Sequence, residues 1–316
     1  MIENLDADRL MAGPLGQWLE QQASARDEAR KASNGRFAIA LPALLALLVL
    51  GLVTGLLSIG FSGFVYMAIA MFAMVWAYKP RADAVQRVKV GINDAIAQAV
   101  GISYTATGEG GECYERCKSF GMFPGHNKRA FEDFWTGEVA GHSFRLFEAH
   151  LEQENRDSDG GSSTKTVFRG PILAFGFARR FHGTTLVVRD LQFKRFLGLG
   201  GQKETIKLDG RKLDAVALVD PDFEDIFDVY SDDQVEARYL VHPAYCERLV
   251  EVERAFAGKK LHALFSGGEL TVVLESDNLF ESGGMDASQD RAKLVQTIGQ
   301  FSALARLAST LNEAPR

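Results

Sequence analysis

The sequence predicts an α+β protein, in which a two-helix transmembrane hairpin precedes a domain of mainly antiparallel sheet with flanking helices. The first observation is an uncharged stretch of 42 residues from Phe37 to Tyr78. The second is the strand-like alternation of apolar residues in most segments after about Ile102. The third is the occurrence of turn-forming residues between neighbouring segments, which is typical of hairpin-linked strands. With 47% hydrophobic and 24% charged residues, the composition is ordinary for a globular protein, so the apolar stretch is a local feature.

The apolar stretch is too long for a single membrane-spanning helix. At about 1.5 Å per residue, 42 residues would extend roughly 63 Å, whereas the hydrocarbon core is about 30 Å thick. We therefore predict two helices, Phe37–Ser58 and Ser62–Tyr78, with a turn near residues 58–63. Gly60 and Gly63 in this turn allow backbone angles that other residues avoid. The alternative is an apolar hairpin buried in one leaflet or in a protein core.

Basic residues on both sides of the apolar stretch predict its orientation. Because positive residues stay on the cytoplasmic side, both chain termini are expected there, and the uncharged turn is expected on the far side. The 36 residues before the stretch and the second span after it argue against a cleaved signal peptide. The basic residues are Arg26, Arg30, Lys31 and Arg36 before the stretch, and Lys79, Arg81, Arg87 and Lys89 after it.

Small residues recur at a spacing of four within both predicted spans. Gly51 and Gly55 form one pair, and Ala73 and Ala77 form the other. This spacing lets helices approach closely. We expect the two faces to pack on each other within the hairpin; the alternative is a homo-oligomer or contact with another membrane protein.

The remaining chain divides into three predicted parts. Residues 1–36 form a cytosolic segment, partly helical, with a short helix after Pro14. Residues 79–101 form a linker helix, because apolar residues repeat there at helical spacing. Residues 102–316 form the cytosolic α+β domain.

Turn signals place the strands of this domain. We predict a hairpin that turns near Ala140 and Gly141, a polar connection at 156–164, and strands within 166–181 and 183–190. Asp209-Gly210 is a strong two-residue turn signal, and Gly267-Gly268 predicts another hairpin.

Three helices are predicted in the second half of this domain. Ser231 and Gln234 have the spacing of a capping box, which predicts a helix that ends near Leu240. Pro243 begins the next helix, and residues 290–311 form an amphipathic terminal helix.

The charge and the cysteines exclude some classes of function. A net charge of −6 gives no reason to expect nucleic-acid binding, which favours basic surfaces. Cys113 and Cys117 lie four residues apart on a predicted helix, where a zinc site would need two more ligands. With Cys246 they make an odd number of cysteines, which we expect to be reduced thiols in the cytosol.

Two glycine-rich segments are candidates for phosphate-binding loops. Residues 108–112 read GEGGE and residues 198–205 read GLGGQKET. Neither has the glycine and lysine spacing of a P-loop or of a dinucleotide-binding turn, so both are predicted to be ordinary loops.

An acidic cluster is a candidate cation site or source of general acids and bases. It lacks the glycine and the final glutamate of a calcium loop, and acids are common near helix starts. Asp157 and Asp159 in the DSDGG segment also lack the further ligands of a calcium loop. We therefore predict no metal site here, although an enzyme could use Asp220, Asp222 and Asp225. The cluster comprises Asp220, Asp222, Glu224, Asp225, Asp228, Asp232 and Asp233.

Motifs for nucleophilic catalysis are missing from the sequence. There is no GxSxG and no HExxH, and the six histidines are scattered. Cys117 and His126 could form a thiol–imidazole pair, but we expect structural histidines. The phenylalanines between 168 and 196 are expected in the core, with a groove for acyl chains as the alternative. The sequence thus predicts no catalytic, cofactor-binding or metal-binding residues and no cofactor. The histidines are 126, 142, 150, 182, 242 and 262, and the phenylalanines are 168, 175, 177, 181, 193 and 196.

Three segments resemble the bacterial membrane protein family known as domain of unknown function 3137. They are VFRGPILAFGFARRFHGTTLVVRD at 167–190, LVDPDFEDIFDVYSDDQVEARYLVHPAYCERL at 218–249, and FSGGELTVVLESDNLFE at 265–281. The resemblance implies a protein of the bacterial inner membrane with a cytosolic α+β domain and no assigned activity. It also implies a LemA-type membrane protein as a candidate partner.

Together these observations favour a non-enzymatic scaffold, adaptor or regulator with a cytosolic binding domain. We expect its partners to be the lipid bilayer, crossed twice, and another protein, with no nucleic acid. The alternatives are a membrane-tethered hydrolase that uses carboxylates and a lipid-binding protein. An adaptor should expose an apolar patch or a sheet edge.

Overall fold

The structure, a computed structural model, forms two compact units. The first comprises residues 6–95 and 281–296, and the second comprises residues 96–280 and 297–316 together with the first five residues. The second unit is thus inserted into the first along the chain. The structure describes residues 5–55, 61–139, 141–156, 161–177, 181–189, 204–218, 221–224, 226–255 and 261–311.

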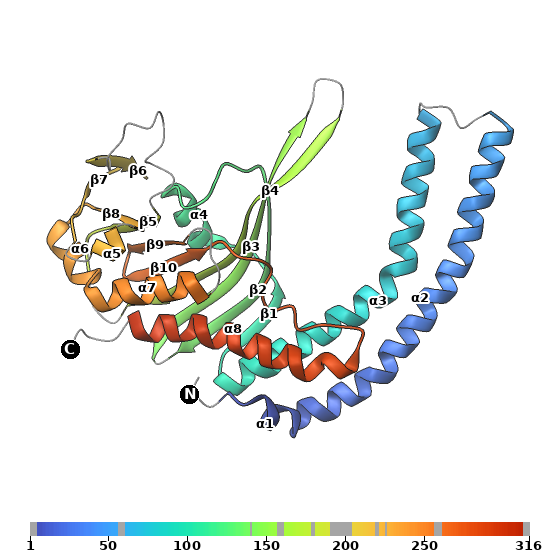
Figure 1. The fold of residues 1–316 in the computed structure, drawn as a ribbon, viewed down its shortest axis with the longest axis horizontal. Helices are drawn as coiled ribbons and strands as arrows, with labels where there is room; N and C mark the ends of the chain where they lie inside the picture. The colour runs from blue at the N-terminus through green and yellow to red at the C-terminus, as the bar shows by residue number, and fades with distance from the viewer. Residues whose placement is uncertain are drawn as a thin grey trace. The chain divides into compact units, whose positions relative to one another are not determined.

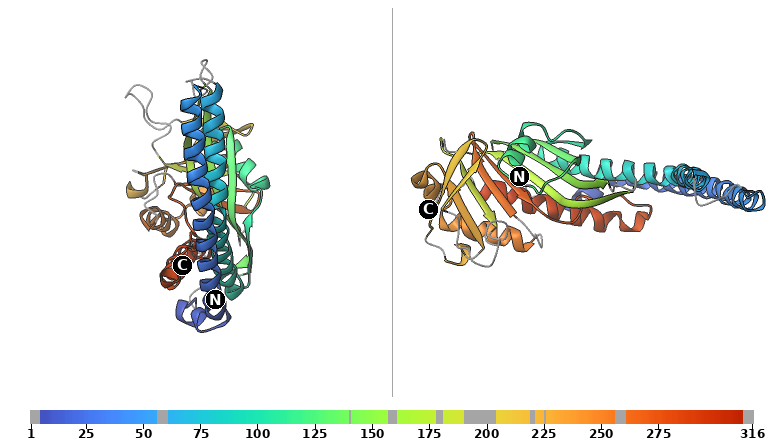
Figure 2. Two further views of the ribbon diagram at one scale, coloured as in Figure 1. Left: turned by 90° about the vertical axis from the view of Figure 1, so that its right-hand side faces the viewer. Right: turned by 90° about the horizontal axis from the view of Figure 1, so that it is seen from above.

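The first unit is built on two long antiparallel helices. The short α1 (Ala7–Met11) precedes α2 (Pro14–Val53), and α3 (Phe61–Val100) returns beside it. Figures 1 and 2 show α2 and α3 side by side along their length. The 3-10 helix η2 (Ala287–Gln289) and the start of α8 (Asp290–Leu311) complete this unit.

The long helices differ from the predicted spans at their ends. The helix predicted over Phe37–Ser58 is part of α2 and ends at Val53, where Gly55 follows with a φ of +68°. A glycine in this left-handed conformation is a common helix terminator. The predicted second span and linker helix form one helix, α3, which continues through Pro80. Of the turn predicted at 58–63, residues 58–60 lie outside the described part.

Both long helices are long and apolar enough to cross a membrane. In their uncharged parts the large side chains point outward, and Leu52, Phe64 and Phe72 are 62%, 69% and 74% exposed. An apolar surface of this extent on a protein marks a contact with lipid or with another protein.

The second unit contains one ten-stranded sheet in the order β1-β2-β3-β4-β10-β9-β5-β8-β7-β6. Every pair of neighbours is antiparallel, so the predicted α+β class with antiparallel sheet is confirmed. The strands are β1 (Ser103–Thr107), β2 (Lys128–Val139), β3 (His142–Arg156), β4 (Ser162–Gly176), β5 (Thr185–Arg189), β6 (Thr205–Leu208), β7 (Arg211–Ala215), β8 (Phe227–Ser231), β9 (Leu261–Ser266) and β10 (Glu269–Leu274).

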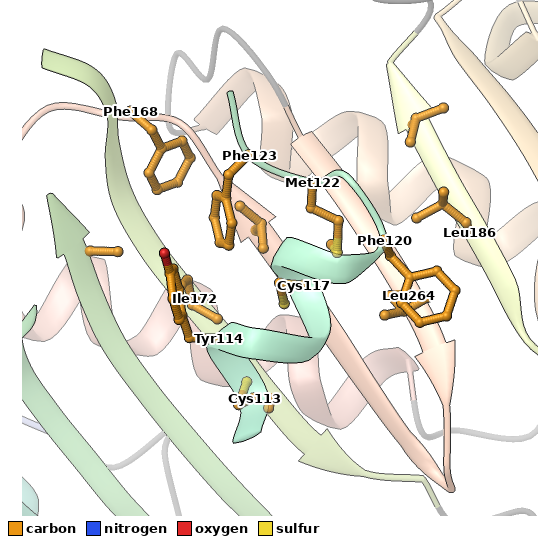
Figure 3. Close-up of a cluster of buried hydrophobic side chains, with 14 of the residues drawn as sticks. Cys113, Tyr114, Cys117, Phe120, Met122, Phe123, Phe168, Ile172, Leu186 and Leu264 are labelled. Atoms are coloured by element: carbon orange, nitrogen blue, oxygen red, sulfur yellow. The ribbon is translucent and has the colours of Figure 1, made fainter. Parts of the chain in front are cut away.

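Helices cover both faces of this sheet. On one face α4 (Gly111–Ser119) packs over residues of the central strands, such as Ile172 and Leu264 (Figure 3). On the other face lie α7 (Pro243–Ala255) and the second half of α8, where Phe301 contacts the Trp135 and Phe144 rings at centroid distances of 5.0 and 5.9 Å. The central strands β9 and β10 are therefore buried on both of their faces.

The predicted turns occur where expected. Asp209 and Gly210 connect β6 to β7, and both have positive φ, at 49° and 70°. Gly267 and Gly268 likewise connect β9 to β10. Two positive φ values in a two-residue loop match the right-handed twist of the flanking strands, which is why such loops favour glycine and asparagine or aspartate.

The helix predicted after Ser231 has a different N-cap. Helix α6 (Gln234–Leu240) is capped by Asp233, whose carboxylate accepts hydrogen bonds from the amides of Val235 and Glu236. The capping-box prediction is therefore wrong about Ser231, which is buried as the last residue of β8. The short α5 (Pro221–Glu224) and strands β1 and β8 were not predicted.

Candidate membrane-proximal site

The acidic cluster serves the backbone of its own region. The Leu218 amide donates to Glu224 at 2.6 Å, and the Thr184 amide donates to Asp232 at 2.5 Å. Asp233 caps α6, and Asp228 is buried within β8. Asp220, Asp225 and the side chain of Asp222 lie outside the described residues, as do Asp157 and Asp159.

Glu236 completes this arrangement and was not singled out in the sequence. Its carboxylate accepts from the amides of His182 at 3.0 Å and Gly183 at 2.6 Å. Together with Asp232, it holds the segment before β5 against the start of α6. The sequence carries no signal for this role, because the amides that Glu236 binds belong to a segment more than 50 residues earlier in the chain. These carboxylates are therefore engaged as structural acceptors.

Removal of the α6 cap tests this structural role. We expect Asp233→Ala to lower the free energy of unfolding of the second unit by about 1 kcal/mol, because two α6 amides lose their acceptor. Asp233→Asn should leave stability almost unchanged, since asparagine caps helices equally well. Urea unfolding of the purified protein in detergent measures both values. An equal loss for the two variants would show that the charge, and not the cap, is what matters.

The cysteines lie in the core. Cys113 and Cys117 lie on the buried side of α4, in the same cluster as Phe120 and Met122 (Figure 3), and all three cysteines are free thiols. The contact with Cys113, followed by burial, raises the pKa of Cys117 well above its usual value. Such a thiol stays protonated and unreactive, which disfavours the thiol–imidazole pair with His126.

His126 has other partners. Its Nδ1 lies 2.8 Å from the Pro124 carbonyl oxygen, and its Nε2 meets the Tyr114 hydroxyl. Burial raises the pKa of Tyr114, whose ring also stacks under the Arg129 guanidinium. The imidazole thus fastens the segment after α4 to the helix.

The glycine-rich segment 108–112 packs against aromatic rings. A Cβ added at Gly108 would lie 2.9 Å from the Phe134 ring, and one at Gly110 would lie 2.6 Å from Tyr114 Cβ. Glycine is therefore needed for close packing, in keeping with the predicted absence of a phosphate loop. Residues 198–203 of the second glycine-rich segment lie outside the described part.

The phenylalanine-rich region contributes to the core as predicted. Phe168, Phe175 and Phe181 are buried, and Phe177 and Phe181 meet Phe265 edge-on at 5.5 and 6.0 Å. Phe193 and Phe196 lie outside the described residues.

A groove runs along α2 and α3 just beyond the uncharged stretch. Its volume is about 350 Å³, and alanines of α2, including Ala29 and Ala32, line it. Basic side chains from both helices line it too, and we call this feature the basic groove. A second groove of about 510 Å³, which passes Trp18 and Gly91, shares Asp83 and Arg87 with it. The residues of the basic groove are Ala25, Glu28, Ala29, Ala32, Arg36, Lys79, Pro80, Asp83 and Arg87.

Pro80 explains why Arg36 has a fixed place in this groove. Proline has no amide hydrogen, so the carbonyl four residues earlier, on Trp76, loses its helical partner. The Arg36 guanidinium donates to this Trp76 oxygen at 2.9 Å and lies 5.0 Å from the centre of the Trp76 ring. Ser33 Oγ donates to the Ala77 carbonyl at 2.8 Å. Side chains of α2 thus supply hydrogen-bond donors to the α3 carbonyls next to Pro80.

The basic groove carries an excess of positive charge. Lys79 forms an ion pair with Asp83 at 3.1 Å. Within the described part of the chain, neither Arg36 nor Arg87 has a carboxylate at ion-pair distance. The sequence predicted Arg36, Lys79 and Arg87 only as markers of orientation. Their convergence depends on the alignment of α2 with α3, which periodicity does not predict.

The small-residue pairs have separate roles. Ala77 is fully buried in the helix pair, in agreement with packing within the hairpin. Gly55 instead ends α2 and is exposed.

Comparisons with known proteins bear on the second half of the chain. The family model described as "Protein of unknown function (DUF3137)" matches residues 166–313, so the predicted resemblance is confirmed. No curated protein matches the sequence. The crystal structure of the mycobacterial trehalose monomycolate transport factor A, TtfA, is similar over 71% of this chain and 95% of that chain. It has 13% sequence identity and a TM-score of 0.33, which is too distant to inform function.

Proposed function

We propose that this protein, whose residues 166–313 match the family of unknown function, is an integral protein of the bacterial inner membrane that binds another protein. It acts as a non-enzymatic scaffold, adaptor or regulator, with its sheet domain in the cytoplasm. The observation that carries the proposal is the pair of long helices with outward-facing apolar side chains and basic residues at one end.

The arrangement of the helix pair supports the orientation. Arg36 and Lys79 lie at the same end of the hairpin, since Arg36 contacts Trp76 directly. The far end, at Gly55, is uncharged. Because basic residues tend to remain on the cytoplasmic side, this arrangement supports a topology with both termini in the cytoplasm.

Two features of the second unit support protein binding. Among the described strands, β1 and β6 are the edges of the sheet, and strand edges can pair with a partner's backbone. On α6, Val235 and Tyr239 are 80% and 53% exposed, although they are apolar and one helical turn apart. We name this pair the α6 patch. The partner we would test first is a LemA-type membrane protein; self-association is the second candidate.

Substitutions in the α6 patch test this binding function. We expect Val235→Ser together with Tyr239→Ser to reduce recovery of a co-expressed LemA-type protein, or of a differently tagged second copy, about tenfold. Recovery is measured after purification of the intact protein in detergent. Val295→Ser, which changes another exposed valine at 46% exposure, is the control and should bind normally.

The membrane part of the proposal has its own readout. The protein should resist carbonate extraction, and protease added outside spheroplasts should leave the sheet domain intact. Release by carbonate would refute the membrane anchor. If the patch variant recovers both candidate partners as well as the unaltered protein does, the α6 patch is not the binding surface.

A further inference from the structure

We propose that the basic groove binds the phosphate of an anionic phospholipid headgroup from the cytoplasmic leaflet. This inference rests on the proposed membrane insertion of the hairpin. The inference goes beyond membrane insertion, because it assigns a specific lipid site to Arg36, Lys79 and Arg87.

The position of the groove matches the headgroup layer. Arg36 immediately precedes the uncharged stretch, and Lys79 immediately follows it. Headgroups occupy roughly 5–8 Å beyond each side of the hydrocarbon core. From Lys79 to Arg87 the helix rises about 12 Å, so the groove begins among the headgroups and opens toward the cytoplasm.

Arg36 is pre-organised to receive a phosphate. Its Nη1 is engaged by the Trp76 carbonyl, and the Trp76 ring lies against the guanidinium. A guanidinium has five N–H donors in a planar fork, so the remaining donors can bind phosphate oxygens. Because Pro80 makes the Trp76 carbonyl available, the arginine is held in place before any lipid arrives.

The three basic residues of the lining outnumber its two carboxylates, those of Glu28 and Asp83, so the charges around the groove favour an anionic lipid over a zwitterionic one. Lys79 and Asp83 are 64% and 48% exposed, and an exposed ion pair of this kind is weak, so Lys79 can turn to a phosphate. The exposed Arg87 attracts an anionic headgroup but repels the quaternary ammonium of phosphatidylcholine. The alanines of the floor leave room for the headgroup, since their side chains are short.

The test uses the full chain in nanodiscs of phosphatidylcholine containing spin-labelled phosphatidylglycerol or spin-labelled phosphatidylcholine. The fraction of immobilised lipid gives the preference for the anionic headgroup. We expect Arg87→Gln to lower this preference about tenfold, because the bound phosphate loses a charge-assisted hydrogen bond that a residue outside the groove does not make.

Lys31→Gln is the matched control. Lys31 is an exposed base on α2 that precedes the uncharged stretch by fewer residues than Arg87 follows it, and it does not line the groove. It should leave the preference nearly unchanged. An equal effect of Lys31→Gln would indicate general surface attraction and overturn the site. Displacement of the labelled lipid by millimolar inorganic phosphate would instead indicate a site for free phosphate and would also overturn it. If Arg87→Gln keeps the preference for phosphatidylglycerol while the protein resists carbonate extraction, the groove proposal fails and the membrane anchor stands.

Discussion

Arg26→Ala is expected to destabilise the helical unit by about 3–5 kcal/mol, because it leaves a buried carboxylate without its partner. Arg26 and Asp290 form two hydrogen bonds of 3.0 and 2.7 Å, and their side chains are only 2% and 4% exposed. Water cannot replace the lost guanidinium at this depth. Hydrogen–deuterium exchange of the purified protein in detergent should show faster exchange in α2 and in residues 281–296.

The neighbouring pair supplies the control. Arg291 and Asp8 form the same two-bonded geometry at 2.8 and 3.0 Å, but their side chains are 59% and 67% exposed. Arg291→Ala should therefore change exchange very little, since exposed ion pairs are screened by water. Replacing Arg26 by Met and Asp290 by Leu together should recover much of the stability, because no charge is then left buried. If Arg291→Ala reduced protection from hydrogen exchange as much as Arg26→Ala does, burial would not explain the difference between the two ion pairs.

The second large effect is expected at Gly170 in β4. Its φ is +146°, and a Cβ there would overlap the Leu274 carbonyl oxygen and lie 2.9 Å from the Ser276 nitrogen. Both neighbours are backbone atoms, so they cannot move aside as a side chain could. We expect Gly170→Ala to cost about 3 kcal/mol or more through strain and overlap. Urea unfolding, monitored by the fluorescence of the buried Trp135, measures this loss of stability.

Gly299 is the corresponding control in the same unit. It lies within α8, is exposed, and has no heavy atom within 4 Å of an added Cβ. Gly299→Ala should stabilise the protein by about 0.5–1 kcal/mol, because alanine favours the helix. If the free energy of unfolding falls for Gly170→Ala and rises for Gly299→Ala, the loss at Gly170 comes from the local clash and not from glycine's general flexibility. A change in the same direction for both variants would refute this explanation.

Local patterns in the sequence predicted much of the fold. The turns at Asp209-Gly210 and Gly267-Gly268 and the helix over 290–311 occur as predicted, because each depends on a short segment. Strand β8 was missed because its apolar residues lie within an acidic run. The capping error at Ser231 arose because that residue satisfies a strand ladder, which is a tertiary requirement.

The candidate sites were harder to predict because they depend on contacts distant in sequence. The roles of Asp232 and Glu236 became evident only when the segment 182–184 lay beside α6. The basic groove requires the pairing of Arg36 with Trp76, forty positions apart. Neither relationship leaves a periodic pattern in the sequence.

The ion pair between Arg26 and Asp290 also sets an order of assembly during synthesis. Its two residues are 264 positions apart, so at 5–20 residues per second the ribosome needs about 13–50 s to supply the second after the first. Both apolar helices leave the ribosome long before that moment. In the proposed membrane topology, the hairpin enters the bilayer before Asp290 is available to pair with Arg26, and this ion pair joins α2 to α8 only afterwards.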